Sequence, residues 1–208
     1  MDSPDVMYRE DVIETHTKYD TTDVDVVDGR VTARPRSVDL LVRTERHVPR
    51  TGVMIVGWGG NNGTTVTASL LANKQGLTWH TRRGVERANF VGSVTMASTV
   101  RLGASSTTGR DVFVPLRTLL PMIDLNNLIV GGWDISSMPM GDAMERAAVL
   151  PYDLQRQLKD EMNEMRPLPS VYFPDFIAAN QGERADNVLE GAQGLCGPPR
   201  HVPLPLSR

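Results

Sequence analysis

The sequence predicts an α/β fold built on a doubly wound, mostly parallel sheet, preceded by a small antiparallel β segment. Three observations predict it: an apolar run that enters a glycine-rich turn at residues 51–71, four strand–helix alternations along the chain, and alternating apolar residues before residue 50. Repeated strand–helix alternation favours a parallel sheet covered by helices. We divide the chain into a β segment (1–50), a nucleotide-binding domain (51–187) and a Gly/Pro-rich tail (188–208).

Composition limits the classes of function. The 208-residue chain has a formal net charge of −3, so it lacks the basic excess of nucleic-acid-binding proteins. Cys196 is its single cysteine, which excludes an intrachain disulfide framework and a cysteine-cluster zinc site. No apolar run reaches the roughly 20 residues of a membrane span, and the acidic N-terminus does not look like a secretory signal. We expect a cytoplasmic protein without metal, nucleic-acid or membrane partners.

The first 50 residues alternate in the manner of β-strands. Thr22–Val27 is one strand candidate, Asp28-Gly29 is a strong hairpin signal, and Val31 and Ala33 resume the alternation. Residues 38–42 predict a third short strand. We interpret this segment as a small antiparallel sheet that covers an edge or packs against a neighbouring subunit.

The stretch at residues 51–71 carries the strongest functional signal. Val53–Val56 is a candidate buried strand, a glycine turn follows, and a helix over Thr64–Ala72 should end near residues 73–76. Together they predict a Rossmann-like dinucleotide cradle, because glycine lets the backbone approach a pyrophosphate and a helix N-terminus directs free N–H groups at it. Asn62 stands where the common G-x-G-x-x-G pattern has its third glycine. A loop that merely connects strand to helix is the alternative.

The signal expected next is missing. An ordinary Rossmann unit has an acidic residue at the end of its second strand, about 20 residues past the turn. This chain has Trp79–Gly84 there, and we interpret it as an insertion whose Arg82 and Arg83 either hold an extra phosphate or are solvated. Residues 90–100 are ambiguous, and residues 112–115 predict a short strand.

A later strand supplies an acidic candidate. Residues 128–136 read as a buried strand with Asp134 near its C-terminal end, the edge at which open α/β sheets collect ligands. Asp134 is either an acceptor for the ribose or nicotinamide side of a cofactor, or the N-cap of the helix that follows. The local pattern does not decide between these roles.

Two helices and one more strand complete the predicted domain. Residues 140–148 form a helical stripe that is broken near Pro151, and Asp153 is expected to cap a second helix that prolines 167 and 169 stop. The methionines of these helices are expected to fill the core. Residues 171–179 predict a buried strand. From about Val188 glycine and proline replace apolar periodicity, which is typical of a disordered tail.

Five segments in one order resemble the myo-inositol-1-phosphate synthase (inositol-3-phosphate synthase) family. They are SPDV at residues 3–6, YDTT at 19–22, GWGGNNG at 57–63, GWDIS at 132–136 and PSVYFPDFIAANQ at 169–181. The resemblance covers about residues 2–187. It implies a Rossmann-type NAD domain joined to an α/β domain that builds a homotetramer. It also implies isomerisation of D-glucose 6-phosphate to 1D-myo-inositol 3-phosphate, which serves inositol and phospholipid biosynthesis. In that reaction tightly held NAD oxidises C5, enolisation and an intramolecular aldol closure follow, and the hydride returns.

The resemblance also assigns cofactor contacts. The residues that match the family's NAD contacts are Gly59, Gly60, Asn61, Asn62, Asp134, Ser170, Val171, Gln181 and Arg184. The match favours the cofactor role for Asp134. Gly182 stands where the family usually has serine, which is a minor departure.

The larger departure concerns length. The family continues for some hundreds of residues past the ADN of residues 185–187, and those residues hold its catalytic lysines, its substrate phosphate pocket and its tetramer-forming sheet. We therefore expect a fold that is incomplete relative to the family, through alternative splicing, a frameshift or an incorrect gene model, and we name no catalytic residue. Three readings compete: a synthase whose activity belongs to the full-length form, an inactive truncated isoform that binds NAD or associates with full-length subunits, and a chain that does not fold stably.

Overall fold

The chain divides into two compact units. The computed structural model describes residues 3–171 and 185–189. Unit 1 comprises residues 1–50 and 90–127, and unit 2 comprises residues 51–89 with the described residues from 128 on. Residues 90–127, which we assigned to the nucleotide-binding domain, thus group with the N-terminal β segment.

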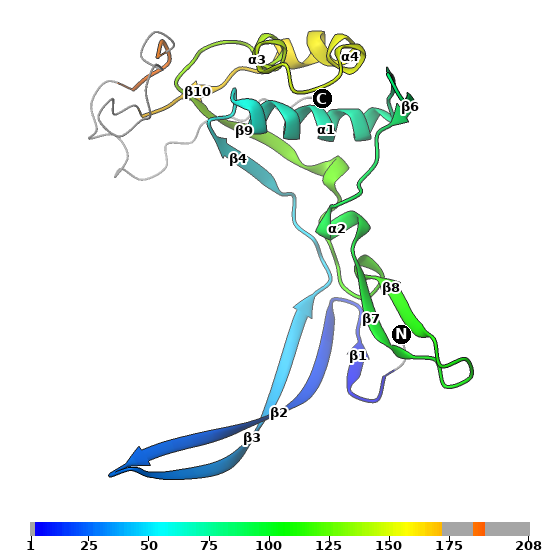
Figure 1. Cartoon of the computed structure of the whole chain (residues 1–208), viewed down its shortest axis with the longest axis vertical. Coiled ribbons are helices and arrows are strands. Elements are labelled where there is room, and N and C mark those ends of the chain that lie inside the picture. Colours follow the sequence, from blue (N-terminus) through cyan, green and yellow to red (C-terminus); the bar gives the residue numbers. More distant parts are fainter. Residues whose placement is uncertain (1–2, 172–184, 190–208) are drawn as a thin grey trace. The chain divides into compact units, whose positions relative to one another are not determined.

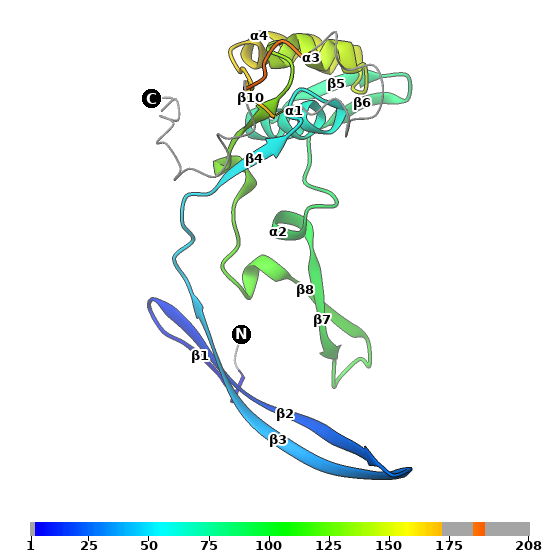
Figure 2. The same ribbon diagram turned by 90° about the vertical axis from the view of Figure 1, so that its left-hand side faces the viewer.

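Unit 1 contains a long antiparallel ribbon. β1 (Val6–Tyr8), β2 (Val12–Val27) and β3 (Arg30–Glu45) form a sheet in the order β1-β2-β3. Figure 2 shows β2 and β3 as one curved hairpin, and their register is unbroken from end to end. The φ angles of Asp28 and Gly29 are 50° and 74°, as a tight two-residue hairpin turn requires. The predicted turn and antiparallel segment are confirmed.

The predicted strand boundaries in this ribbon are wrong. We expected separate short strands over residues 31–33 and 38–42, but β3 runs continuously through the polar residues between them. Backbone pairing does not require apolar side chains, so the alternation of apolar residues underestimates strand length. Pro35 lies inside β3 without breaking it, because β3 is an edge strand of the sheet and an edge tolerates a missing N–H donor.

A second, shorter hairpin belongs to unit 1. β7 (Thr99–Ala104) pairs with β8 (Asp111–Pro115), and the short helix α2 (Val94–Ala97) precedes them. Two single turns of 3₁₀ helix follow, η1 (Leu116–Thr118) and η2 (Leu125–Asn127). The strand predicted over residues 112–115 is confirmed. The ambiguous stretch over residues 90–100 becomes a loop, α2 and the start of β7.

Unit 2 is an α/β layer. β4 (Gly52–Val56), β9 (Ile129–Asp134) and β10 (Leu168–Pro169) form a parallel sheet in the order β10-β9-β4. α1 (Asn61–Gln75) lies between β4 and β9 in the chain, and α3 (Met140–Ala147) and α4 (Tyr152–Asn163) lie between β9 and β10. The predicted α/β class with a parallel sheet is confirmed.

The three helices lie on the same face of this sheet, as Figures 1 and 2 show. Both crossovers step in the same direction, from β4 to β9 and from β9 to β10. Since parallel crossovers are right-handed, they place α1, α3 and α4 on one side. On the opposite face, the described side chains of Met54, Val56 and Trp133 are 41%, 80% and 37% exposed.

The segment that we interpreted as an insertion is a β-hairpin. β5 (Thr78–Thr81) pairs with β6 (Gly84–Arg87), and neither strand joins the parallel sheet. The strand hydrogen-bonded beside β4 is β9 instead. A local insertion of this kind moves the second strand of the sheet far along the sequence.

Two helix boundaries differ from the predictions. α1 begins at Asn61, three residues earlier than expected, and it ends before Gly76, whose φ of 64° makes the left-handed C-cap. The N-cap of α4 is Pro151. The expectation that Asp153 caps α4 is therefore wrong, and its carboxylate binds His80 of the hairpin instead. Of the strand predicted over residues 171–179, all but Val171 lies outside the described residues.

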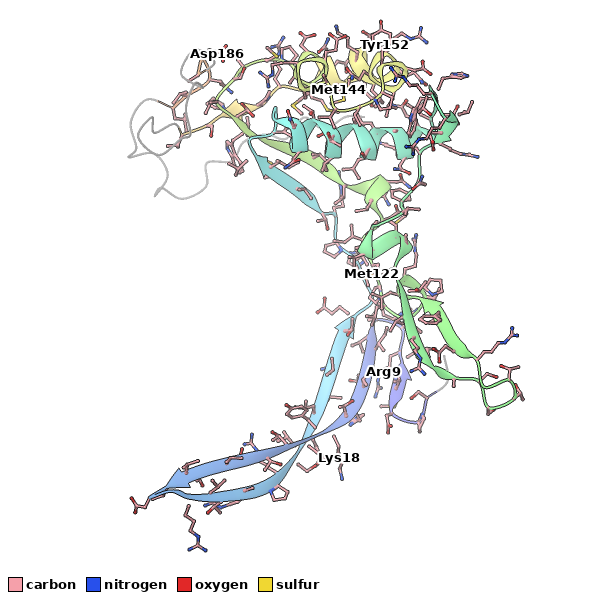
Figure 3. The ribbon with its side chains drawn as sticks, in the orientation of Figure 1. Arg9, Lys18, Met122, Met144, Tyr152 and Asp186 are labelled. Atoms are coloured by element: carbon pink, nitrogen blue, oxygen red, sulfur yellow. The ribbon has the colours of Figure 1, made fainter. Side chains whose placement is uncertain are left out.

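The core of unit 2 lies between the three helices and the sheet. Its buried side chains are those of Trp58, Ala68, Ala72, Met140, Met144, Leu154, Leu158 and Met162. Ile55 and Val130 of the sheet pack against this cluster. Met144, labelled in Figure 3, is 1% exposed. The prediction that methionines fill the core is confirmed for Met140, Met144 and Met162.

Candidate functional site

The glycine turn after β4 is attached to the end of β9. Gly57 has a φ of 74°, and the N–H groups of Gly57 and Trp58 both donate to the Trp133 carbonyl, at 2.8 and 3.0 Å. The Gly60 N–H then donates to the Gly57 carbonyl at 3.0 Å. Gly60 is also the N-cap of α1. The turn therefore brings the first turn of α1 beside the C-terminal end of β9.

Trp58 lies beneath the turn and explains two of the glycines. Its side chain is 4% exposed, and its Nε1 donates to the Thr67 hydroxyl of α1 at 2.8 Å. A Cβ atom on Gly63 would overlap the Trp58 carbonyl, and a Cβ atom on Gly132 would lie 2.6 Å from the Trp58 Cβ. Gly63 and Gly132 therefore make room for Trp58, so that strand, turn and helix can pack closely.

Gly59 is held at both of its peptide groups. Its N–H donates to Oδ2 of Asp134 at 2.8 Å. Its carbonyl accepts from Nη2 of Arg146 at 2.9 Å. A Cβ atom at this position would lie 3.2 Å from the same Asp134 oxygen and 3.8 Å from the Ala143 Cβ. Side chains from β9 and α3 thus determine where the glycine turn lies.

Asp134 joins two loops at this edge of the sheet. It is 8% exposed, and its second oxygen, Oδ1, accepts from the Ser136 N–H at 3.0 Å. The alternative role of N-cap for the next helix is wrong, because α3 begins after Pro139 and has no side-chain cap. Each carboxylate oxygen retains room for a further donor. Asp134 can therefore hold the turn and accept a ligand hydroxyl at the same time.

The topology also accounts for the acidic residue that seemed to be missing. Asp134 ends the strand hydrogen-bonded directly beside β4, which is where the ribose-binding acid of a Rossmann unit lies. It follows Gly59 by 75 residues rather than about 20. The statement that the signal is absent is thus corrected: the β5–β6 hairpin and residues 90–127 displace it along the sequence.

The first turn of α1 is suited to an anion. The first bond inside the helix runs from the Thr64 N–H to the Gly60 carbonyl at 3.0 Å, so the preceding N–H groups have no partner within the helix. Asn61 and Asn62 are exposed, and the first turn carries no acidic residue. A helix N-terminus with free N–H groups favours negative charge. Backbone and sequence here fit the pyrophosphate of a dinucleotide.

The segment 185–189 returns to the same edge. The Asn187 side chain donates to the Asp134 carbonyl at 3.0 Å, and the Asn187 N–H donates to the Ile135 carbonyl at 2.8 Å. The Asp186 carboxylate accepts from the Ser137 N–H at 2.8 Å and from its hydroxyl at 2.6 Å. These two donors lower the pKa of Asp186 from its ordinary value. The segment therefore fixes the loop that follows Asp134.

The predicted cofactor residues fall into three groups. Gly59, Gly60, Asn61, Asn62 and Asp134 come together at the glycine turn. Ser170 and Val171 follow β10, which pairs with β9, and the Ser170 N–H donates to the Asn187 carbonyl at 3.0 Å. Gln181 and Arg184 lie outside the described residues.

Sequence reasoning missed Arg146, Asp186 and Asn187. The first lies in an ordinary amphipathic helix, and the other two form a common polar pair, so none carries a local signal. Their roles follow from partners distant in sequence: Arg146 is 87 residues from Gly59, and Asn187 is 53 residues from Asp134.

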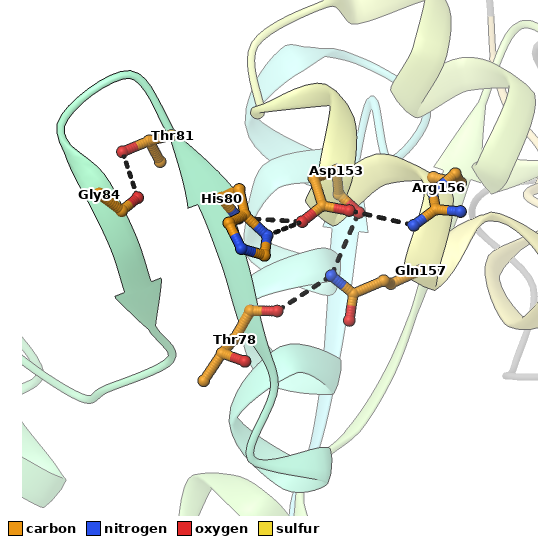
Figure 4. A network of polar contacts seen from close by, with 7 residues as sticks. All are labelled: Thr78, His80, Thr81, Gly84, Asp153, Arg156 and Gln157. Carbon is orange, nitrogen blue, oxygen red and sulfur yellow. Dashed lines mark hydrogen bonds and ion pairs between the residues drawn. The ribbon is translucent and has the colours of Figure 1, made fainter.

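A separate polar network anchors the β5–β6 hairpin to α4 (Figure 4). One carboxylate oxygen of Asp153 accepts from the His80 N–H at 2.9 Å and lies 3.2 Å from its ring Nδ1. Arg156 contacts the other oxygen at 3.3 Å. The backbone and ring of His80, then Arg156, lower the pKa of Asp153. The network holds the hairpin against the helix and takes no part in the glycine turn.

Two further expectations concern metals and membranes. Within residues 3–171 and 185–189, no group of three or more His, Cys, Asp or Glu side chains could hold a metal ion. Over the same residues, no helix is long and apolar enough to cross a membrane.

Comparison with known proteins agrees with this geometry. A family model described as "Myo-inositol-1-phosphate synthase" matches residues 51–195, and the matched region is an NAD-binding domain. The chain is 52% identical over 192 residues to inositol-3-phosphate synthase of Drosophila melanogaster, covering 92% of this chain and 34% of the relative. It is 52% identical over 193 residues to inositol-3-phosphate synthase 1 of Mus musculus, covering 93% of this chain and 34% of the relative.

A solved structure gives the same result in three dimensions. The crystal structure of inositol-3-phosphate synthase from Caenorhabditis elegans superposes with a TM-score of 0.84 at 40% identity, covering 92% of this chain and 37% of that one. The chain thus spans little more than a third of the length of the relatives it matches. By its glycine turn, its parallel sheet and these similarities, the chain belongs to the myo-inositol-1-phosphate synthase family and corresponds to its NAD-binding part.

Proposed function

We propose that this chain carries the NAD cradle of an inositol-3-phosphate synthase. The observation that carries the proposal is the 2.8 Å bond from the Gly59 N–H to Asp134. It joins the glycine turn to the acidic residue at the end of the neighbouring strand, and both are parts of a dinucleotide site. NAD, when bound, supplies hydride acceptance and return.

The cradle residues take different roles in this proposal. The N–H groups of Asn61 and Asn62 at the start of α1 bind the pyrophosphate, and glycines 59 and 60 allow the backbone to come close. The carboxylate oxygens of Asp134 accept hydrogen bonds from the hydroxyls of the adenosine ribose. They can do so because each oxygen can accept a further hydrogen bond besides the one from Gly59 or Ser136. Ser170, Val171, Gln181 and Arg184 are proposed as further NAD contacts from their match to the family.

The same carboxylate gives a preference between cofactors. Asp134 is 8% exposed and carries no ion pair within 4.0 Å among the described residues. The extra 2′-phosphate of NADP would approach this negative charge, whereas the ribose hydroxyls of NAD donate to it. We therefore propose that the cradle selects NAD.

The activity of the whole protein is part of the proposal. By resemblance it is the isomerisation of D-glucose 6-phosphate to 1D-myo-inositol 3-phosphate by oxidation, enolisation, aldol cyclisation and reduction, in a cytoplasmic homotetramer. The relatives are named inositol-3-phosphate synthase, but this chain matches only about a third of their length. No catalytic residue is proposed within it.

NAD binding by the 208-residue chain tests the proposal. Isothermal titration should show saturable binding, with at least about tenfold weaker binding of NADP. Asp134→Asn, which keeps the shape but removes the charge, should reduce that preference and weaken NAD binding by about tenfold or more. The matched control is Asp160→Asn, which removes the same charge from an acidic residue on α4 outside the cradle. Equal binding of NAD and NADP, or no effect of Asp134→Asn, would contradict the proposal.

A second candidate is association without catalysis, through which the chain would bind full-length subunits as an inactive isoform. The observation that favours it is the sheet face opposite the helices, where Val56 is 80% exposed and Trp133 is 37% exposed. Sedimentation of the chain with full-length synthase would show a mixed species. The association should weaken when Val56 is replaced by lysine, and an unchanged mixed species would contradict this candidate.

A further inference from the structure

We propose that Arg146 is a positioning residue of the NAD cradle, which places the Gly59 peptide for cofactor binding. This inference rests on the function proposed above. Its starting point is the 2.9 Å bond from Arg146 Nη2 to the Gly59 carbonyl. Arg146 comes from the last turn of α3, so a helix far along the sequence holds the glycine turn.

The two bonds at Gly59 act on the two ends of one residue. Asp134 receives the N–H and Arg146 donates to the carbonyl, so the planes of both adjoining peptides are defined. Gly60, the next residue, is the N-cap of α1. The direction of the free N–H groups in the first helical turn therefore depends on how firmly Gly59 is held. Without these two bonds, glycine would allow this turn to adopt several backbone conformations.

The helix that carries Arg146 is itself anchored. Asn163 of α4 accepts from the Asp142 N–H at 3.0 Å, close to the start of α3. The Nζ of Lys159 on α4 lies 2.6 Å from Oε2 of Glu145 and 3.6 Å from Oδ1 of Asp142. The contact with Glu145 raises the pKa of Lys159. A Cβ atom on Gly141 would overlap α4, so the two helices touch there. α4 thus sets the place of α3, and α3 sets the place of Arg146.

Arg146 also corrects an electrostatic problem of the cradle. The Asp134 carboxylate, 8% exposed, lies beside a turn that should receive an anionic pyrophosphate. Like charges in a partly desolvated site repel strongly. The guanidinium of Arg146, which is always charged, meets the same glycine from the other side. It therefore offsets the negative charge of Asp134 without the two side chains having to pair with each other.

A mere structural role predicts something different from a positioning role. If Arg146 only stabilised the fold, its loss would weaken every ligand of the site in parallel. If it positions the phosphate-binding turn, its loss should weaken the binding of ligands that contain a pyrophosphate. The binding of adenosine, which has no pyrophosphate, should be unaffected. The comparison of NAD and ADP-ribose with adenosine separates these cases.

The experiment uses the 208-residue chain and three variants. Arg146→Met keeps the apolar stem and removes the guanidinium. Arg146→Lys keeps the charge and one N–H donor for the Gly59 carbonyl. Arg156→Met removes the same charge from α4, where its side chain is 69% exposed and contacts Asp153 rather than the cradle. Affinities for NAD and ADP-ribose are measured by calorimetry, and that for adenosine by NMR titration.

Arg146→Met should lower the affinities for NAD and ADP-ribose by about tenfold, as expected for loss of a hydrogen bond from a charged donor. The affinity for adenosine should change by less than about twofold. Arg146→Lys should recover most of the loss, and Arg156→Met should bind as the wild type does. Unchanged NAD affinity in Arg146→Met overturns the inference. So does an equal loss for adenosine, or an equal loss in Arg156→Met. Absence of NAD binding by the wild-type chain would instead overturn the proposed function, and the inference with it.

Discussion

The two units of this chain are built by different means. In unit 1, Ile13 is the one large apolar residue below a tenth exposure among the described residues, and Val24, Val26, Val27 and Val31 of the ribbon are 57–67% exposed. In unit 2, the buried apolar residues other than Ala143 lie in a single cluster between helices and sheet. Unit 1 is organised by backbone pairing, whereas unit 2 is organised by packing.

Sequence changes should have different effects in the two units. The two long strands of this sheet, β2 and β3, make a ribbon that is marginally stable by itself, because it buries little apolar surface. Its side chains stand out from both faces (Figure 3). Unit 2 instead stabilises the cofactor turn through Trp58, which is in the core and in the turn at once. Substitutions in the buried core of unit 2 should therefore change stability and NAD binding together, whereas side-chain substitutions on the strands of the ribbon should change neither by much.

The largest contrast should come from two glycines. Gly63→Ala places a Cβ atom on the Trp58 carbonyl, so we expect a loss of about 3 kcal/mol or more in the free energy of unfolding. Gly29→Ala, in the ribbon turn, meets no atom within 4 Å and suffers only from its φ of 74°, which costs about 1–2 kcal/mol. Urea unfolding monitored by circular dichroism measures both. A smaller loss for Gly63→Ala than for Gly29→Ala would break the comparison.

Core truncation gives the next effect. Leu158 of α4 is fully buried, so Leu158→Ala should cost about 2–5 kcal/mol. Val26→Ala in the ribbon removes a side chain that is 67% exposed, and should stay within about 0.5 kcal/mol. Thermal melts of both variants, each with and without NAD, are the measurement. A large loss for Val26→Ala would show that the ribbon face is covered in solution.

A single buried hydrogen bond should have a smaller effect. Thr67→Val keeps the shape of the side chain but leaves the Trp58 indole N–H, now 2.8 Å from the hydroxyl, without its partner. The expected cost is about 1–3 kcal/mol. Thr22→Val is the matched change on the ribbon, where Thr22 is exposed, and should be nearly neutral. Urea unfolding of the pair tests this, and equal effects would contradict it.

The smallest effect concerns pH. The pKa of Asp153 is lowered from 3.8, chiefly by the His80 backbone N–H and then by its ring. A lowered folded-state pKa contributes stability above the unfolded-state value and loses it as pH falls through the folded-state pKa. Unfolding of the hairpin anchor should thus begin only below about pH 4.

Carbon-detected NMR titration of Asp153 measures this shift. His80→Ala removes the ring and keeps the backbone donor, so the midpoint should rise and still stay below 3.8. A midpoint at or above 3.8 in the wild type would contradict the contact that Figure 4 shows.

Much of the fold was readable from the sequence because its determinants are local. The ribbon turn depends on Asp28-Gly29, and the end of α1 depends on Gly76, each of which adopts a left-handed backbone. The strand, glycine turn and helix at residues 52–75 follow one another without a break. Apolar periodicity, turn residues and caps act within a few residues, so one sequence is enough to show them.

The assembly of the site depends on contacts between segments that are far apart in the chain. Asp134 meets Gly59 across 75 residues, and Arg146 meets it across 87. Local patterns cannot show which strand lies beside β4, because the β5–β6 hairpin and residues 90–127 intervene. Hydrogen bonding between distant segments and the burial of Trp58 choose that neighbour. Local sequence signals therefore specify the parts of the cradle, and only folding brings its acidic and basic side chains to the same glycine.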